Sequence, residues 1–274
     1  FSNTWSFTSR YFCYFSIFGT EKTFSERYSY SGGLILNKEE LLKSSAASIG
    51  VELSDIQISQ FIKYHEILVE WNSFMNLTGI TEYEEVVQKH FVDSLALCKA
   101  MDVNQISSLI DIGTGAGFPG IPLKIAYPHL KVTLLDSLQK RIKFLNEVVM
   151  QLGLTDVETI HGRAEDFAKP SMKRESYDVC VSRAVASLAS LSEYCLPYVK
   201  VEGYFVPYKS GKVDEELEES KKAVFLLGGK IEEEVKFNLP DSDISRSLIK
   251  IKKVSSTPKK YPRKSGLATK EPIK

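Results

Sequence analysis

A turn with three glycines follows a short apolar run, and its spacing suits a ligand that must be approached closely. The stretch reads SSLIDIGTGAGFPGIPLKI, in which Gly113, Gly115 and Gly117 alternate and Asp111 stands two residues before the first of them. Glycine allows a positive φ and lets a backbone pass where any Cβ would clash. Gly115, Gly117 and Gly120 also match the dinucleotide pattern G-x-G-x-x-G, which alone is a weak indication. The turn predicts a ligand site and leaves the ligand open.

Two features of this stretch favour a cationic ligand without phosphate. The Asp111 carboxylate repels a pyrophosphate but accepts hydrogen bonds from an ammonium group. Pro119 and Pro122 delay the following helix and remove amide donors that would bind phosphate. S-adenosylmethionine fits these features, and DIGTGAG resembles the first motif of the Rossmann-like methyltransferases, D/E-x-G-x-G-x-G. A nicotinamide dinucleotide, bound by an oxidoreductase, is the alternative.

Polar residues follow the next two strands at the spacing that such a cofactor requires. Asp136, 19 residues after Gly117, ends the run VTLLD, and an acid at this place can bind a ribose diol. The third strand is followed by HGRAEDF, in which Arg163, Ala164 and Glu165 lie where an adenine is expected. In this order, these residues predict S-adenosylmethionine as the cofactor.

Short apolar strands alternate with helices after residue 106, which predicts an α/β fold whose parallel sheet has helices on both faces. Residues 36–105 have helical patterns, with Asn37 and Thr81 as caps, and form an N-terminal extension. Residues 106–254 form the Rossmann-like domain, and residues 255–274 form a basic tail. Residues 1–35 show neither helix nor strand periodicity. We expect them to be disordered or untranslated, with the start of translation at Leu36.

The end of the fourth strand, in YDVCVSRAVASL, indicates which kind of atom accepts a methyl group. The stretch lacks the N/D-P-P-Y/F sequence used for exocyclic amines and the Pro-Cys used for cytosine C5. Cys180 lies inside the strand and is expected in the core, which leaves Ser182 and Arg183 at its end. A ring nitrogen with an in-plane lone pair, such as guanine N7, needs only alignment and exclusion of water. The stretch is therefore typical of a reaction without a covalent step.

Six stretches together resemble the small-subunit ribosomal RNA methyltransferase G family, also called glucose-inhibited division protein B. They are WNSFMNLTGIT, KHFVDSLAL, DIGTGAGFPGIPLKI, LLDSLQKRIKFL, SYDVCVSRAVASL and TPKKYPRKSG, and the resemblance runs from Asn37 to Lys274. It implies methyl transfer from S-adenosylmethionine to N7 of guanine 527 in 16S ribosomal RNA, in the bacterial cytoplasm. It also implies a Rossmann-like methyltransferase fold with a mostly parallel seven-stranded sheet and a helical N-terminal extension. A methyltransferase for another RNA site is the nearest alternative.

The resemblance also assigns site residues. For the cofactor it adds Phe118 and Arg183 to the positions above, and Arg183 either binds the cofactor or faces the guanine. The predicted cofactor set is Gly113, Gly115, Gly117, Phe118, Asp136, Ala164, Glu165 and Arg183.

Three residues of the N-terminal motifs, Asn76, His90 and Asp93, are assigned to catalysis together with Arg183. We expect them to close over the mouth of the cofactor site and to orient the guanine. His90 and Asp93 are three residues apart on a helix and share a face, so that Asp93 can hold the imidazole in one tautomer. The alternative is a helix cap for Asn76 and a buried structural pair for the other two.

Charge is balanced over the chain, with 35 basic and 35 acidic residues, but the C-terminus is basic. Residues 250–274 hold nine Lys or Arg and one acid, Glu271. Prolines keep this tail extended, and we expect it to order only on binding RNA. The predicted RNA contacts are Lys140, Arg141, Lys143, Lys259, Lys260, Tyr261, Arg263 and Lys264.

The remaining features predict the setting of the protein. The expected partner is 16S ribosomal RNA or the small ribosomal subunit, bound by a monomer. No run approaches the roughly 20 apolar residues of a membrane span. Four cysteines without a C-x-x-C pair favour a reducing, cytoplasmic compartment with no metal site. A non-catalytic RNA-binding protein would keep the basic tail without the full cofactor set.

Overall fold

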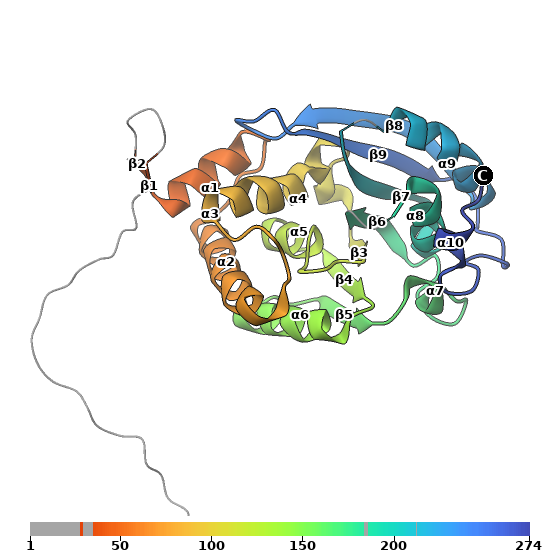
Figure 1. Ribbon diagram of the computed structural model, residues 1–274, viewed down its shortest axis with the longest axis horizontal. Coiled ribbons are helices and arrows are strands. Elements are labelled where there is room, and N and C mark those ends of the chain that lie inside the picture. Colours follow the sequence, from red (N-terminus) through yellow and green to blue (C-terminus); the bar gives the residue numbers. More distant parts are fainter. Residues whose placement is uncertain (1–27, 30–34, 184–185, 212) are drawn as a thin grey trace, which may run out of the picture. The chain divides into compact units, whose positions relative to one another are not determined.

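The computed structural model describes residues 28–29, 35–183, 186–211 and 213–274 (Figure 1). The chain divides into two compact units, Phe1–Asn37 and Lys38–Lys274. In the first, β1 (Tyr28–Ser29) and β2 (Ile35–Leu36) pair antiparallel. Residues 1–27 and 30–34 lie outside the described residues, and so does most of the segment for which disorder or lack of translation was predicted.

The described part of the second unit contains a seven-stranded sheet in the order β5-β4-β3-β6-β7-β9-β8. The first five strands in that order are parallel, while β9 is antiparallel to both β7 and β8. This arrangement confirms the predicted α/β class and the mostly parallel sheet. The strands are β3 (Ser108–Ile112), β4 (Lys131–Asp136), β5 (Val157–His161), β6 (Tyr177–Arg183), β7 (Val199–Ser210), β8 (Gly229–Asn238) and β9 (Ser245–Lys253).

The N-terminal extension is helical, as predicted. It contains α1 (Lys38–Ala47) and α2 (Asp55–Met75), and a capping box between Ser54 and Gln57 begins α2. A second helical segment runs without interruption through α3 (Tyr83–Val86), the π-helix η1 (Val87–Val92), α4 (Asp93–Leu95) and the 3-10 helix η2 (Ala96–Lys99). Its N-cap is Glu82, which makes no side-chain cap bond, so the prediction of Thr81 as the cap is wrong. A 3-10 turn, η3 (Val103–Gln105), precedes the sheet.

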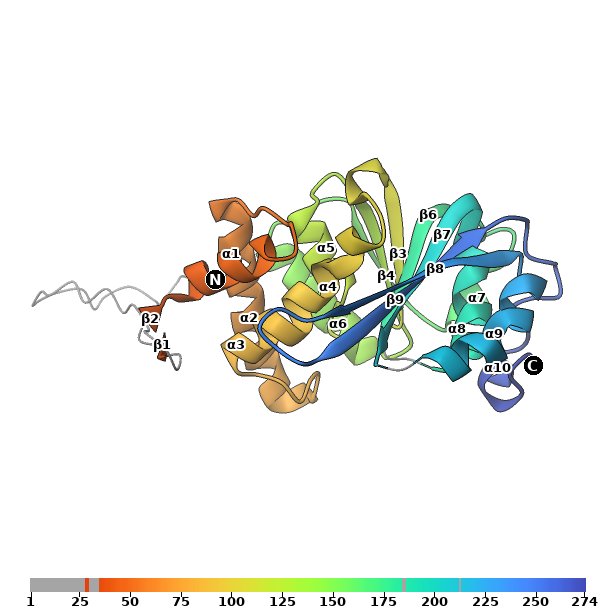
Figure 2. The same cartoon turned by 90° about the horizontal axis from the view of Figure 1, so that it is seen from above.

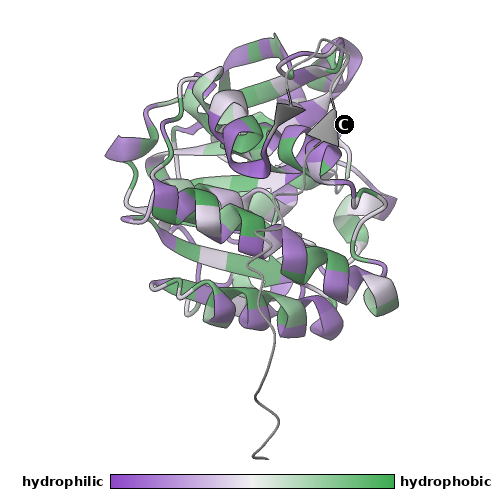
Figure 3. Ribbon diagram, turned by 90° about the vertical axis from the view of Figure 1, so that its left-hand side faces the viewer, coloured by the Kyte–Doolittle hydropathy of each residue, from purple (hydrophilic) through white to green (hydrophobic). Residues whose placement is uncertain are grey.

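Helices cover both faces of the sheet, and Figure 2 shows the two layers on either side of it. One layer holds α1, α2, α4, α5 (Gly120–Ala126) and α6 (Gln139–Gln151). The other holds α7 (Ala164–Phe167), α8 (Leu188–Cys195), α9 (Asp214–Leu226) and α10 (Leu267–Lys270), with the 3-10 turn η4 (Leu196–Tyr198) after α8. Each layer packs on the sheet through its own buried cluster. Figure 3 shows central strands in green or pale colours and helices that are green on one side and purple on the other, as expected of amphipathic helices packed on a sheet.

The C-terminal segment is folded against the domain. It contains α10, and the Tyr261 side chain lies in the second buried cluster with 8% of its surface exposed. The prediction of an extended tail that orders only on RNA binding is therefore wrong. Among the described helices, none is long and apolar enough to span a membrane.

Candidate active site

The site lies where the chain reverses its direction through the sheet. From β3 the chain builds outward through β4 to β5, and it then returns to place β6 on the other side of β3. Open parallel sheets bind ligands beyond the carboxyl ends of the strands at such a switch point. Here those ends are Ile112 and Arg183, with Asp111 paired to Val181 one step inside.

The glycines after β3 serve two different purposes. Gly113, Gly115 and Gly117 all have positive φ, at 71°, 63° and 95°. A Cβ on Gly117 would meet Ile121 Cγ1 at 2.7 Å, and one on Gly120 would meet Leu134 Cδ2 at 2.4 Å. A Cβ on Gly115 would meet no protein atom within 4 Å. Gly117 and Gly120 are thus required by packing inside the protein, while Gly115 faces open space.

Asp111 carries the one unpartnered buried polar side-chain atom among the described residues. Its Oδ2 accepts hydrogen bonds from Thr114 Oγ1 at 2.7 Å and from the Gly120 amide at 2.9 Å, whereas Oδ1 has no partner. The side chain is fully buried. Burial raises the pKa of this carboxyl to about 6, against the opposing effect of the two hydrogen bonds and, more weakly, of Arg183. A buried oxygen without a donor is a vacant acceptor position for a ligand that brings an N–H or O–H group.

Asp136 ends β4 next to the glycine turn. Its Oδ2 accepts hydrogen bonds from the Gly115 amide at 3.0 Å and from Arg141 at 3.1 Å, and its Oδ1 accepts one from the Leu138 amide. The structure thus ties Arg141, a predicted RNA contact, to a predicted cofactor residue. Lys140 donates to the carbonyl of Met75 and so caps α2.

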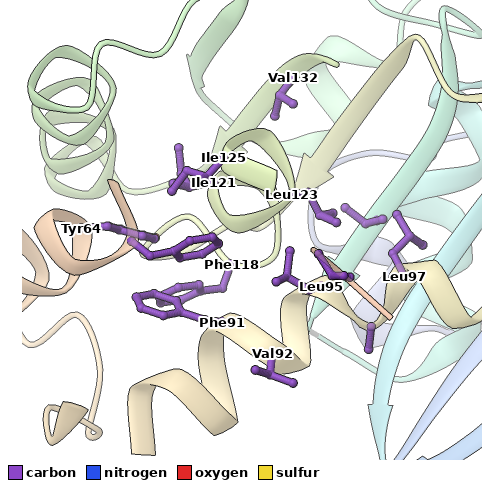
Figure 4. Packing of buried hydrophobic residues seen from close by; sticks show 14 of the residues in the cluster. Tyr64, Phe91, Val92, Leu95, Leu97, Phe118, Ile121, Leu123, Ile125 and Val132 are labelled. Carbon is purple, nitrogen blue, oxygen red and sulfur yellow. The ribbon is translucent and has the colours of Figure 1, made fainter. Parts of the chain in front are cut away.

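An aromatic cluster joins the helical extension to the glycine turn. Tyr64 of α2 is fully buried, and its hydroxyl donates to the carbonyl of Ala116. Its ring packs on Phe91 and Phe118, with ring centroids 5.6 and 5.4 Å away, and Figure 4 shows the three rings together. His90 stacks on Phe118 at 4.5 Å. Phe118 therefore links the predicted cofactor turn to the predicted catalytic residues.

Two arginines share the carboxylate of Asp93. Arg183 Nη1 lies 3.0 Å from Oδ2, and Arg246 Nε lies 3.0 Å from Oδ1, with 4% of the Asp93 side chain exposed. Arg183 also donates to the carbonyl of Lys89 and lies over the Phe118 ring at 5.1 Å. The guanidinium of Arg183 is therefore fixed at the end of β6 by an ion pair, a carbonyl and an aromatic face.

His90 does not pair with Asp93, contrary to prediction. Its Nε2 lies 2.9 Å from Thr78 Oγ1, and its Nδ1 lies 3.3 Å from Arg183 Nη2 and 3.1 Å from the Lys89 carbonyl. Burial and then the Arg183 charge lower the pKa of His90 to about 4. The imidazole is therefore neutral at pH 7.

Asn76 is the C-cap of α2. Its φ of 51° is left-handed, and its amide donates to the carbonyl of Asn72. The side chain is exposed. The predicted alternative, a cap role, describes this geometry.

A pocket of about 450 Å³ opens beside Arg183, towards the end of β7 and the start of β9. Lys209 borders it and donates to the carbonyl of Ala186 at 2.8 Å and to Glu216 at 2.7 Å. The charged residues that line it, among those described, are Lys89, Arg183, Lys209, Arg246, Asp93 and Glu216. Lys89 also pairs with Glu85 outside the lining, which leaves a small surplus of positive charge that suits a nucleotide.

The predicted adenine-binding residues lie in the single turn α7. The carbonyl of Ala164 accepts a hydrogen bond from the Tyr198 hydroxyl at 2.5 Å. The Glu165 side chain is buried, and its Oε1 accepts one from the amide of Gly266 at 2.8 Å. The C-terminal segment thus reaches a predicted cofactor residue.

The predicted RNA contacts of the tail are divided between the surface and the interior. Lys259, Lys260 and Lys264 are exposed, whereas the ring of Tyr261 is buried and cannot stack on a base in this conformation. Arg263 forms an ion pair with Glu193. Among the described residues, no group of three or more His, Cys, Asp and Glu side chains could hold a metal ion.

Several residues of the site were missed from the sequence. Lys209 and Ser210 end β7 as Ser182 and Arg183 end β6, so the rule on strand ends could have identified Lys209. Arg246 is the second residue of the antiparallel strand β9 and lies opposite Ser210, so its place at this edge depends on the hairpin register. Tyr64 has no sequence signal beyond helical periodicity.

The parallel sheet with a switch point, the glycine turn and the acids ending β3 and β4 define a Rossmann-like methyltransferase. Residues 57–249 match the family model described as GidB, rRNA small subunit methyltransferase G. The chain belongs to this family, which confirms the predicted resemblance and excludes the nicotinamide oxidoreductase.

This chain is similar in sequence to individual members of the family over most of their length. Ribosomal RNA small subunit methyltransferase G of Lachnoclostridium phytofermentans is 60% identical over 226 residues, which cover 82% of this chain and 93% of that protein. The Clostridium novyi protein of the same name is 52% identical over 234 residues, covering 85% and 96%.

Two solved structures are similar to this chain at low sequence identity and with TM-scores below 0.5. A SAM dependent methyltransferase from Aquifex aeolicus is 18% identical with a TM-score of 0.46, over 61% of this chain and 92% of that one. M. jannaschii TYW2 in complex with AdoMet is 16% identical with a TM-score of 0.47, over 59% and 77%.

Proposed function

We propose that this protein transfers a methyl group from S-adenosylmethionine to N7 of guanine 527 in 16S ribosomal RNA, in the bacterial cytoplasm. The observation that carries the proposal is the vacant acceptor position on Asp111. A buried carboxylate oxygen at the carboxyl end of β3, without a donor, fits the ammonium of the cofactor's amino-acid part. It would repel the pyrophosphate of a dinucleotide.

The other cofactor contacts follow from the neighbouring strand ends. Gly115 leaves open space beside the turn, where the cofactor backbone can pass. Each carboxylate oxygen can accept two hydrogen bonds, so Asp136 retains capacity for a ribose hydroxyl beside its present donors. Ala164 and Glu165 contact the adenine. When bound, the cofactor supplies an electrophilic methyl group on a sulfonium.

The pocket beside Arg183 receives the guanosine. A base must leave its stack to reach such a pocket, and the surplus of cations suits the phosphates that come with it. Guanine N7 carries no proton, so the site needs no general base, and a neutral His90 is consistent with this. Arg183, held by Asp93 and Phe118, orients the base, and its fixed position supplies the alignment on which the rate depends.

The test uses 16S RNA from cells that lack this protein, with cofactor labelled in the methyl group. We expect label at one nucleotide, identified as N7-methylguanine at position 527 by chemical cleavage at that base. RNA in which guanine 527 is replaced by adenine should accept no label. Label at another nucleotide would refute the assignment of the acceptor, and the absence of label from any RNA, including assembled small subunits, would refute the activity.

A further inference from the structure

The last residues of the chain form a strap across the layer of helices that contains α7 and α8. We define the C-terminal strap as residues 257–271. Arg263 makes its strongest contact: its amide, Nε and Nη2 all donate to the Glu193 carboxylate, with Nη2 to Oε2 at 2.6 Å. Only 1% of the Glu193 side chain is exposed. Bidentate contacts of this kind to a buried carboxylate are among the stronger polar interactions in proteins.

Further hydrogen bonds hold the strap along its length. Ser190 on α8 donates to the carbonyl of Ala268 at 2.8 Å, and Tyr194 bonds to Thr269 at 2.7 Å. Arg263 Nη2 also donates to the carbonyl of Glu271, which closes the strap into a loop.

The strap reaches α7 from both ends of that helix. At the start of α7, the amide of Gly266 donates to Glu165 Oε1. At its end, Arg174 donates to the carbonyl of Ala168 at 3.1 Å and, with the same nitrogen, to the carbonyl of Tyr261 at 2.9 Å. Among the described residues, the Gly266 amide is the one donor to the Glu165 carboxylate.

A helix of four residues cannot hold its own conformation, because nucleation of a single turn is unfavourable. Its geometry must come from what is packed around it. When only part of a population has the binding geometry, the apparent affinity for a ligand falls by that fraction.

We infer that the C-terminal strap positions the adenine-contacting turn α7 through Glu165, so that cofactor affinity depends on Arg263 and Gly266, about 100 residues further along the chain. Arg263 is a positioning residue for the cofactor and is not an RNA contact. The inference rests on the proposed function, since it assigns α7 to the adenine of S-adenosylmethionine.

The experiment measures binding of S-adenosylhomocysteine, the demethylated cofactor, by calorimetry with the full chain. Arg263→Ala should weaken binding roughly tenfold, because release of the strap removes the charge-assisted hydrogen bond from the Gly266 amide to Glu165. Lys270→Ala removes an exposed cation of the same strap and serves as the control, with an affinity unchanged within about twofold. The Michaelis constant for RNA at saturating cofactor should not change in Arg263→Ala.

A combination of variants separates positioning from a general loss of stability. If the strap acts through Glu165, Arg263→Ala should weaken binding no further in a Glu165→Gln background. S-inosylhomocysteine, which differs at the purine 6-position, should bind wild type more weakly than the adenosine compound, and Arg263→Ala should reduce this preference. If Arg263→Ala does not fold, because Glu193 is left without its counter-charge, Arg263→Lys keeps the cation and should show a smaller loss of the same kind.

Three results would overturn the inference. The first is wild-type cofactor affinity in both Arg263 variants. The second is a double variant in which the losses of cofactor affinity caused by Arg263→Ala and by Glu165→Gln multiply. The third is a raised Michaelis constant for RNA as the sole effect of Arg263→Ala. Failure of the wild type to bind S-adenosylhomocysteine would instead refute the proposed function, and the strap inference with it.

Discussion

Replacing Gly115 by alanine tests whether the glycine turn is open for a ligand. Its φ is 63°, and a Cβ there would touch no protein atom within 4 Å. Within the protein, Gly115→Ala therefore costs only backbone strain, about 1–2 kcal/mol. Gly50, between α1 and α2, offers a matched control, because it has a φ of 85° and equally open surroundings.

The two variants should be alike in stability and different in binding. Each should lower the melting temperature by about 2–8 °C, since 1 kcal/mol corresponds to roughly 2–4 °C in a chain of this size. In a calorimetric titration with S-adenosylhomocysteine, Gly50→Ala should bind as the wild type does. Gly115→Ala should bind roughly 5- to 150-fold more weakly, because overpacking by one methyl group costs about 1–3 kcal/mol.

Gly117→Ala provides the opposite case. Its Cβ would lie 2.7 Å from Ile121 Cγ1 and 2.8 Å from the Tyr64 hydroxyl, at a φ of 95°. Strain and overpacking together predict a loss of about 2–5 kcal/mol of stability, clearly more than for Gly115→Ala. Wild-type affinity in Gly115→Ala would show that the cofactor does not pass this residue. Equal melting temperatures for Gly115→Ala and Gly117→Ala would refute the division between a packing and a binding glycine.

Three further predictions concern charge in the site. The folded pKa of Asp111, about 6, lies above its unfolded value, so the native state binds the extra proton and stability falls as pH rises from about 4 to 6. Asp111→Asn should remove this pH dependence and raise stability at pH 7.5 by roughly 1–3 kcal/mol, as measured by chemical denaturation. The same variant should weaken cofactor binding. Asp93→Asn should destabilise the protein by about 3–5 kcal/mol and sharply reduce methyl transfer, because Arg183 and Arg246 lose their shared partner. The control is Glu85→Gln, which removes an exposed ion pair and should change stability by less than about 1 kcal/mol. His90 has a folded pKa of about 4, below its unfolded value, so stability should fall as pH drops from about 6.5 to 4, and replacing His90 by glutamine should flatten the curve in that range.

The fold was predictable because apolar strands and amphipathic helices alternate in the sequence with clear boundaries. The glycine turn and Asp136 could also be placed, since strand ends in a parallel sheet meet at one edge. The C-terminal segment could not, although its residues were read correctly as basic. Its order depends on Glu193 and Arg174, two residues whose sequence context gives no sign that they face the tail. A basic composition indicates disorder only when the folded domain offers no buried groups that bind the charged side chains of the segment.

The prediction that His90 pairs with Asp93 was wrong for a different reason, which lies in the geometry of the helix. The prediction assumed 3.6 residues per turn, so that residues three apart share a face. The segment instead contains the π-helix η1, in which the amide of Asp93 donates to the carbonyl of Gln88, five residues earlier. This wider turn increases the angle between the two side chains, which do not bond to each other although both contact Arg183. As a result one short element can direct His90 to Thr78 and Phe118 while Asp93 meets two arginines from the sheet. A regular α-helix would direct both side chains to one side, so the site depends on a local irregularity that hydrophobic periodicity does not encode.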